Sequence, residues 1–225
     1  MINATRPQIA VITGGHSFDV TGLHKFFRVM SGMDFYIQHM DDFATSSQAV
    51  RDRYDVLLFY HMLREAPMDD NQPWYAGKPL SVLSHLGETG QGICLWHHAL
   101  VAYRQWPTWR ALVGIPDLYS TFHKQQLLHI QVAAPDHPIT QGLTGWRMTE
   151  ETYVMAEPTP SDNQVLLTVD HPQSMQALAW TRHYKQSRVF CLQPGHDDST
   201  WQNENFQTVM TRGLLWCAHK QEVMI

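Results

Sequence analysis

Hydrophobic and polar residues alternate along the first half of the chain in a repeated strand-and-helix pattern. The β-branched run at residues 8–13 is typical of a buried strand and ends at the flexible Gly14-Gly15-His16 turn. Apolar residues then recur every three or four positions through residues 18–30, which predicts an amphipathic helix. Further strands are predicted at residues 35–39, 54–60 and 93–96. Strands that alternate with helices predict βαβ units and a largely parallel sheet.

The pattern changes after Gly114. Five predicted strands follow with only short polar connections, which favours antiparallel pairing; they lie at residues 127–132, 146–155, 164–169, 176–181 and 188–192. A short helix is expected around residues 80–86, and Trp106-Pro107 is expected to divide the helix over 99–113 into two pieces. The polar, proline-containing residues 64–78 predict a long surface loop. We therefore expect one α/β domain over residues 1–225, with a mainly parallel central sheet and extra antiparallel strands in its C-terminal half.

Five histidines follow apolar runs that are predicted to be strands: His16, His61, His97, His98 and His196. Because the carboxyl ends of parallel strands share one edge of a sheet, these imidazoles are expected to converge there. The alternative is that each one is a solvated or structural residue. A His-rich site suits general acid/base chemistry near neutral pH or a borderline metal such as zinc. No HExxH or similar motif decides between these two chemistries.

Carboxylates and aromatic residues in the second half are further candidates. Strand alternation places Glu151 and Tyr153 on one face and Glu150 on the other, so Glu151 and Tyr153 could face the site. The alternative is that both glutamates are ordinary exposed residues. Asp197 follows His196 directly and precedes a helix, where a carboxylate also serves as a cap. Trp201 is a candidate for lining a pocket, although a tryptophan in the first turn of a helix often only packs.

Cysteine chemistry is disfavoured. Cys94 lies inside an apolar run, with Trp96 on the same strand face and opposite Ile93 and Leu95, so it is expected to be an inert core thiol. The sequence has no Gly-x-Ser-x-Gly or Gly-x-Cys-x-Gly turn that would expose a nucleophile. The three cysteines, which are widely spaced and odd in number, fit neither a disulfide framework nor a zinc-thiolate site. They suit a reducing cytoplasm.

Charge and composition narrow the partners. With a net charge of -5 and no Lys/Arg cluster, the chain is not expected to bind nucleic acid or an anionic membrane. Neither a targeting signal nor a membrane span is predicted. A small molecule or another protein is the expected partner. The Trp-rich segments at residues 73–75 and 106–109 either form a subunit contact in a homo-oligomer or pack on their own domain.

The motifs taken together resemble the ThuA-like (trehalose utilisation) family. The resemblance rests on residues 11–16, on residues 90–100 with Trp106-Pro107 and Gly114, on His137-Pro138-Ile139 with Gly142-Leu143, on Glu151-Thr152-Tyr153, and on Gly195-His196 with Trp201 and Asn203. It spans nearly the whole chain and implies a flavodoxin-like, class I glutamine amidotransferase-like three-layer sandwich. Amidotransferases carry their catalytic cysteine at the position of His97, so the resemblance does not imply glutamine hydrolysis.

The resemblance implies a pocket for carbohydrate-derived ligands, including oxidised sugars. We expect His97, His196 and Glu151 to be catalytic, and the other candidates to contact the substrate: His16, His61, His98, Tyr153, Asp197 and Trp201. The activity would be that of a hydrolase, lyase or isomerase without a cysteine nucleophile. If a divalent metal such as zinc is bound, His16, His97 and His196 are the expected ligands. The alternative function is a non-catalytic ligand-binding or subunit-type domain.

Overall fold

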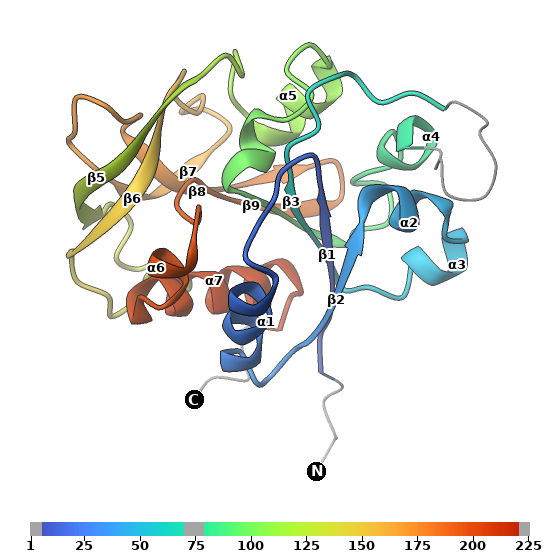
Figure 1. Cartoon of the computed structure of the whole chain (residues 1–225), viewed down its shortest axis with the longest axis horizontal. Coiled ribbons are helices and arrows are strands. Elements are labelled where there is room, and N and C mark those ends of the chain that lie inside the picture. The colour runs from blue at the N-terminus through green and yellow to red at the C-terminus, as the bar shows by residue number, and fades with distance from the viewer. Residues whose placement is uncertain (1–5, 70–78, 221–225) are drawn as a thin grey trace.

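A nine-stranded sheet runs through the protein. The computed structural model describes residues 6–69 and 79–220, and its strands lie in the order β2-β1-β3-β4-β9-β8-β7-β5-β6 (Figure 1). The strands are β1 (Gln8–Gly14), β2 (Asp34–His39), β3 (Val56–His61), β4 (Gly92–Trp96), β5 (Thr121–Val132), β6 (Trp146–Val154), β7 (Gln164–Thr168), β8 (Ala177–Tyr184) and β9 (Ser187–Leu192).

The sheet is mixed, so the expectation of a mainly parallel central sheet with extra antiparallel strands is confirmed only in part. The pairs β1–β2, β1–β3, β3–β4 and β4–β9 are parallel. The pairs β5–β6, β5–β7, β7–β8 and β8–β9 are antiparallel. Antiparallel strands need only short connections, and the short polar segments after Gly114 provide them. The extra antiparallel strands predicted for the C-terminal half therefore make up about half of the sheet.

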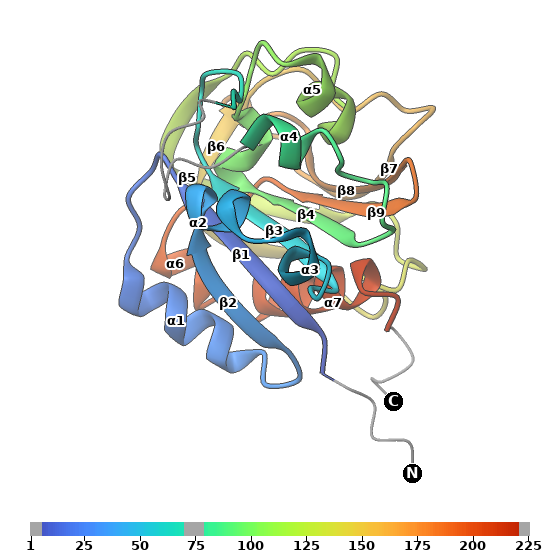
Figure 2. The same ribbon diagram turned by 90° about the vertical axis from the view of Figure 1, so that its right-hand side faces the viewer.

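Helices cover both faces of the sheet, which produces three layers (Figure 2). Alternate residues of β1 pack into separate cores: Ile9 and Val11 face one layer, and Ala10 and Ile12 face the other. The first layer contains α1 (Val20–Val29), α6 (Asp198–Trp201) and α7 (Glu204–Cys217); the second contains α2 (Met40–Thr45), α3 (Gln48–Arg51), α4 (Pro79–Leu83), the 3₁₀ helix η1 (His97–Val101) and α5 (Pro107–Val113).

Most predicted elements are present, with shifted ends. The predicted helix over 99–113 is two pieces, η1 and α5, and Pro107 begins the second one. Proline is favourable there because the first residue of a helix needs no amide hydrogen. The helices α2 and α3 were not expected from the sequence. Residues 70–78 of the predicted loop over 64–78, including the Trp-rich segment at 73–75, lie outside the described residues.

Other expectations concern burial. Cys94 and Trp96 share one core, whereas Ile93 and Leu95 lie in the other, as alternation predicts. Burial raises the pKa of the Cys94 thiol well above its usual value, which fits an inert core residue. Within the described ranges, no helix is long and apolar enough to cross a membrane.

Candidate functional site

His97 stands at the carboxyl end of β4, where the strand turns into η1. Its φ of 52° lies in the left-handed region, which is uncommon for a residue other than glycine. Such strained backbone persists only where surrounding contacts hold it, and it clusters at functional sites. The His97 side chain is fully buried. The strand-to-helix junction predicted from the sequence is therefore present, with His97 on a tight turn.

Three neighbours fix the His97 ring. Its Nδ1 lies 2.7 Å from the Gln193 carbonyl oxygen. Because a carbonyl can only accept, Nδ1 carries the hydrogen and Nε2 keeps a free lone pair. The Tyr153 hydroxyl donates to this Nε2 across 2.9 Å, and Glu151 Oε1 lies 3.6 Å from the same atom. Tyr153 and Glu151 share a face of β6, as strand alternation predicts.

Glu151 connects His97 to His196. Its other oxygen, Oε2, lies 3.4 Å from His196 Nε2, and His196 Nδ1 lies 3.5 Å from Asp197 Oδ2. His196 is 23% exposed, and it lines a cavity of about 220 Å³ together with Glu151 and Asp197. Asp197 also caps α6 by accepting from the Ser199 amide. The cavity thus gives solvent access to a histidine whose two ring nitrogens each face a carboxylate.

Glu151 is held in its ionised form. Burial by itself would raise the pKa of the Glu151 carboxyl, but the nearby side chains of His97, His196 and Lys124 outweigh burial and leave that pKa lowered. Glu151 is therefore a carboxylate at neutral pH, and it can accept a proton or hold a cation.

Glu150 anchors the turn that carries His196, a role that sequence reasoning missed. Its buried carboxylate accepts from the amides of Gly195 at 2.8 Å, His196 at 3.2 Å and Glu151 at 2.7 Å, and from the Thr200 hydroxyl. Burial raises the pKa of Glu150, although His97 and these donors oppose that rise. Strand alternation places Glu150 on the face of β6 opposite Glu151. Alternation does not tell whether that face is buried or exposed, so it could not identify the role of Glu150.

Gly195 is needed where that turn approaches the core. A Cβ at this position would lie 1.8 Å from Trp96 Nε1, and its φ of 136° is open to glycine. The Tyr60 hydroxyl donates to the carbonyls of Gly195 and His196, each across 3.2 Å. Trp201 Nε1 donates to the Gly195 carbonyl at 3.0 Å. The backbone around His196 is therefore fixed from several sides.

His16 and His98 lie beside this group. Their ring centroids are 4.2 Å apart, and those of His16 and His196 are 6.0 Å apart. His98 is 1% exposed, and neither of its nitrogens has a hydrogen-bond partner within the described part of the chain. Burial lowers the pKa of both His16 and His98, with neighbouring histidines adding to the effect, so both rings are neutral at pH 7. The structure therefore brings four of the five predicted histidines together.

Five of the six predicted substrate contacts do not line the cavity, since only Asp197 does, and two of the five, His61 and Trp201, lie among core side chains. His61 is fully buried and packs against Phe59, Tyr103 and Trp109. Trp201 is 1% exposed and supports the Gly195 turn from the core. Their placement is structural, and it favours the alternative interpretation that the sequence left open.

A β-bulge lies opposite Glu151. His123 pairs with Thr152 and Gln126 with Glu150, so Lys124 and Gln125 together face the single residue Glu151. Gln125 has a φ of 57°, and both bulge residues line the cavity. Bulges redirect side chains and are common next to active sites. No glycine or other turn signal marks this point in the sequence, so Lys124 was not among the predicted site residues.

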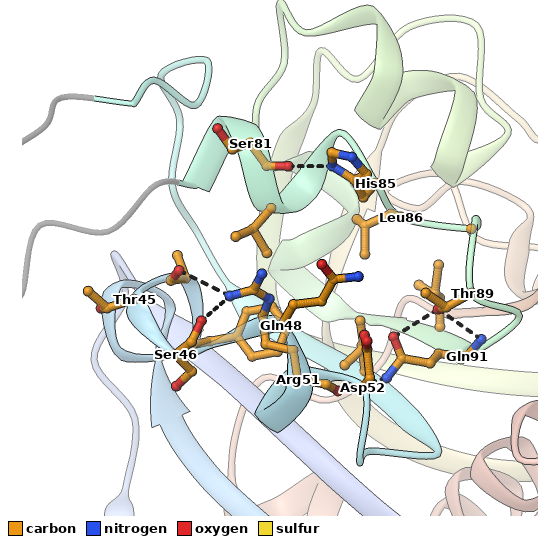
Figure 3. A pocket seen from close by; sticks show the side chains of 16 residues that line it. Thr45, Ser46, Gln48, Arg51, Asp52, Ser81, His85, Leu86, Thr89 and Gln91 are labelled. Carbon is orange, nitrogen blue, oxygen red and sulfur yellow. Dashed lines mark hydrogen bonds between the residues drawn. The ribbon is translucent and has the colours of Figure 1, made fainter.

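Larger cavities lie elsewhere on the protein, and one of them has a volume of about 560 Å³. Figure 3 shows it between α2, α3 and α4, with Arg51 directed toward Ser46 and Gln91 toward Thr89. The Arg51 guanidinium is occupied by the carbonyls of Ala44 and Ser46. None of the predicted site residues lines this cavity. Most polar side chains that line it form hydrogen bonds with other groups of the protein. The cavity of about 220 Å³ beside His196 therefore remains the candidate functional site.

Among the residues that the structure describes, one set of side chains could hold a metal ion. His97, Glu151 and His196 each offer a ligand atom, and these atoms lie within 4.8 Å of one another. The ligands expected from the sequence are His16, His97 and His196. Glu151 takes the place of His16 in this set.

The arrangement defines an α/β protein with an imidazole–carboxylate site at the carboxyl end of β4. The ThuA family, described as trehalose utilisation, matches residues 9–217, and the chain belongs to this family. No curated protein matches the sequence.

Solved structures show the same fold. A ThuA-like protein from Parabacteroides merdae is 17% identical with a TM-score of 0.73, and the match covers 95% of this chain and 90% of that one. A cytoplasmic protein from Salmonella typhimurium is 14% identical (TM-score 0.65; 92% and 98% covered). A third structure, PurLQS from Thermotoga maritima, is 13% identical (TM-score 0.55; 94% and 98% covered). These likenesses support the three-layer α/β fold.

Proposed function

We propose that this ThuA-family protein transfers protons on a sugar or an oxidised sugar derivative bound in the cavity beside His196. The observation that carries the proposal is the Glu151 carboxylate, which lies between two histidines at the cavity, 3.6 Å from His97 Nε2 and 3.4 Å from His196 Nε2. Paired carboxylate and imidazole groups are the usual partners in general acid/base catalysis near neutral pH.

Each residue has a distinct role. Glu151 is the base, because it lines the cavity and is ionised at neutral pH, so that its carboxylate can accept a proton. His196 is the acid, because it lines the cavity and its two ring nitrogens face the carboxylates of Glu151 and Asp197. His97 is fully buried and does not line the cavity, so it positions Glu151 and Tyr153 without touching the substrate.

The cavity limits the ligand. Its volume of about 220 Å³ is below the roughly 300–1,000 Å³ that is usual for pockets of drug-sized ligands. This size favours a single sugar unit over a disaccharide. Lys124 lines the same cavity and places a positive charge near Glu151, where it can bind the carbonyl or carboxylate oxygen of an oxidised sugar. A cytoplasmic location fits the three buried free cysteines and the Salmonella neighbour that is described as cytoplasmic.

Proton exchange provides the test. The protein is incubated in D₂O with a panel of aldoses, aldonic acids and oxidised hexoses, and deuterium incorporation next to the carbonyl is followed by NMR. Glu151→Gln and His196→Gln are expected to slow exchange by about 10²–10⁴-fold, the usual contribution of a general acid or base. His24→Gln, an exposed change on α1, is the matched control and keeps the full rate.

The outcomes separate the alternatives. Saturable sugar binding without exchange would support the non-catalytic binding domain. Neither binding nor exchange with any sugar of the panel would overturn the proposal. Replacing Lys124 by Gln is expected to raise KM for acidic and oxidised sugars while leaving kcat for neutral ones unchanged.

A further inference from the structure

We propose that His97, Glu151 and His196 form a binding site for one divalent transition-metal ion. The inference deepens the proposed function, since it concerns the same cavity, but its evidence is separate: the spacing and orientation of three ligand atoms.

The spacing is that of ligands around an ion. The Glu151 oxygens lie 3.6 Å from His97 Nε2 and 3.4 Å from His196 Nε2, which is longer than an N–H···O hydrogen bond of about 2.7–3.2 Å. Zinc binds imidazole nitrogen and carboxylate oxygen at about 2.0–2.2 Å, so neighbouring ligands of a tetrahedral ion lie about 3.3–3.5 Å apart. One ligand atom from each of the three side chains lies within 4.8 Å of the other two, which is close enough for a single ion to contact all three.

An acceptor group at the Nδ1 of each histidine orients its ring. The Gln193 carbonyl accepts a hydrogen bond from His97 Nδ1 at 2.7 Å, and this directs the lone pair of Nε2 toward Glu151. Asp197 lies 3.5 Å from His196 Nδ1 and can do the same for that ring. Histidines that bind metals almost always donate their other nitrogen to a carbonyl or carboxylate in this way. The backbone strain at His97 places the first of these rings, since Asn, Asp and His are the residues that best tolerate a positive φ.

Two nitrogen ligands and one carboxylate leave room for further ligands. His16, whose Nδ1 is buried without a partner in the described chain, lies next to His196. The cavity itself admits water or a sugar oxygen. Two imidazoles and one carboxylate suit zinc, cobalt, manganese or ferrous iron more than magnesium, which prefers oxygen ligands. One Tyr153 contact competes with the ion, because its hydroxyl donates to the same His97 lone pair.

The experiment uses the untagged full-length chain, since a polyhistidine tag would bind the same ions. After chelator treatment and dialysis, Zn²⁺ and Mg²⁺ binding is measured by calorimetry, and Co²⁺ binding by its visible absorption. We expect one Zn²⁺ per chain, weak or no Mg²⁺ binding, and a Co²⁺ spectrum with nitrogen and oxygen ligands. Glu151→Gln and His196→Gln are expected to weaken Zn²⁺ by at least ~100-fold, and Asp197→Asn by about tenfold.

Controls keep the result specific. His24→Gln and Glu65→Gln change exposed residues of the same types and should leave Zn²⁺ affinity unchanged. Tyr153→Phe removes the competing hydroxyl and should tighten it. Absence of Zn²⁺ and Co²⁺ binding, or binding that survives Glu151→Gln, would overturn the inference. Proton exchange on a sugar together with no Zn²⁺ or Co²⁺ binding would refute the metal site but not the proposed function. Zn²⁺ binding without any sugar binding or exchange would refute the proposed function but not the metal site.

Discussion

Replacing Glu150 by Gln tests whether its carboxylate holds the His196 turn. Oε1 accepts from the amides of Glu151 and His196, and Oε2 from the amide of Gly195 and the hydroxyl of Thr200. A carboxamide has one acceptor oxygen, so its NH₂ group must face one of these two pairs. Thr200 can rotate and accept, but the Gly195 amide then loses its acceptor in a buried position.

The cost follows from these bonds. An unsatisfied buried donor costs about 1–3 kcal/mol, and the remaining bonds weaken from about 1.5–3 to about 0.5–1.5 kcal/mol each because the acceptor is no longer charged. The raised pKa of Glu150 indicates that burying the charge already offsets part of this gain. A net loss of about 2–4 kcal/mol is expected, which lowers Tm by roughly 5–15 °C for a chain of this size.

Urea unfolding of wild type and variant measures the difference. The midpoint should fall with an unchanged m-value, since the loss is local and the surface exposed on unfolding is the same. Glu65→Gln, at an exposed position, should stay within about 0.5 kcal/mol of wild type. If Glu150→Gln is as stable as this control, the carboxylate does not hold the turn and the reasoning fails.

Three further substitutions probe other parts of the molecule. Gly195→Ala should destabilise the protein and reduce sugar exchange together, since the new methyl group would collide with Trp96; wild-type values for both in a thermal melt and the D₂O assay would contradict this. Burial lowers the pKa of His61 to about 3, so its contribution to stability is lost as pH falls from 6.5 toward 3, at up to about 1.4 kcal/mol per pH unit. His61→Phe should therefore match wild type at pH 7 and exceed it by about 2 kcal/mol at pH 5 in urea titrations, and equal pH profiles would refute the neutral state of His61. His97→Asn, which tolerates the positive φ, should fold with near wild-type Tm but lose exchange; retained exchange would remove His97 from the site.

The sequence predicted those features of the site that depend on local periodicity. The apolar run before His97 placed it at the end of a strand, and alternation put Glu151 and Tyr153 on one face. The family resemblance supplied the three-layer fold. In contrast, His61 follows an equally apolar strand and lies in an aromatic cluster, because its surroundings come from residues more than 40 positions later in the chain.

The features that could not be predicted depend on contacts between distant segments. The proportion of antiparallel pairs depends on which strands become neighbours. The bulge at Lys124 and Gln125 comes from the register between β5 and β6 and has no local composition signal. The burial of Glu150 depends on a turn 45 residues later, where Gly195 donates to it.

The central place of β9 has a consequence for how the protein is made. This strand completes the sheet between β4 and β8, yet about 90 residues of chain separate it from its parallel partner β4. During synthesis, the edge of the apolar β4 that pairs with β9 therefore stays without a partner strand until residues 187–192 leave the ribosome. Nascent chains stopped before that point should depend on chaperones to avoid aggregation, and longer ones should not. The same strand leads into Gln193, so docking of β9 also sets when the His97 ring becomes fixed.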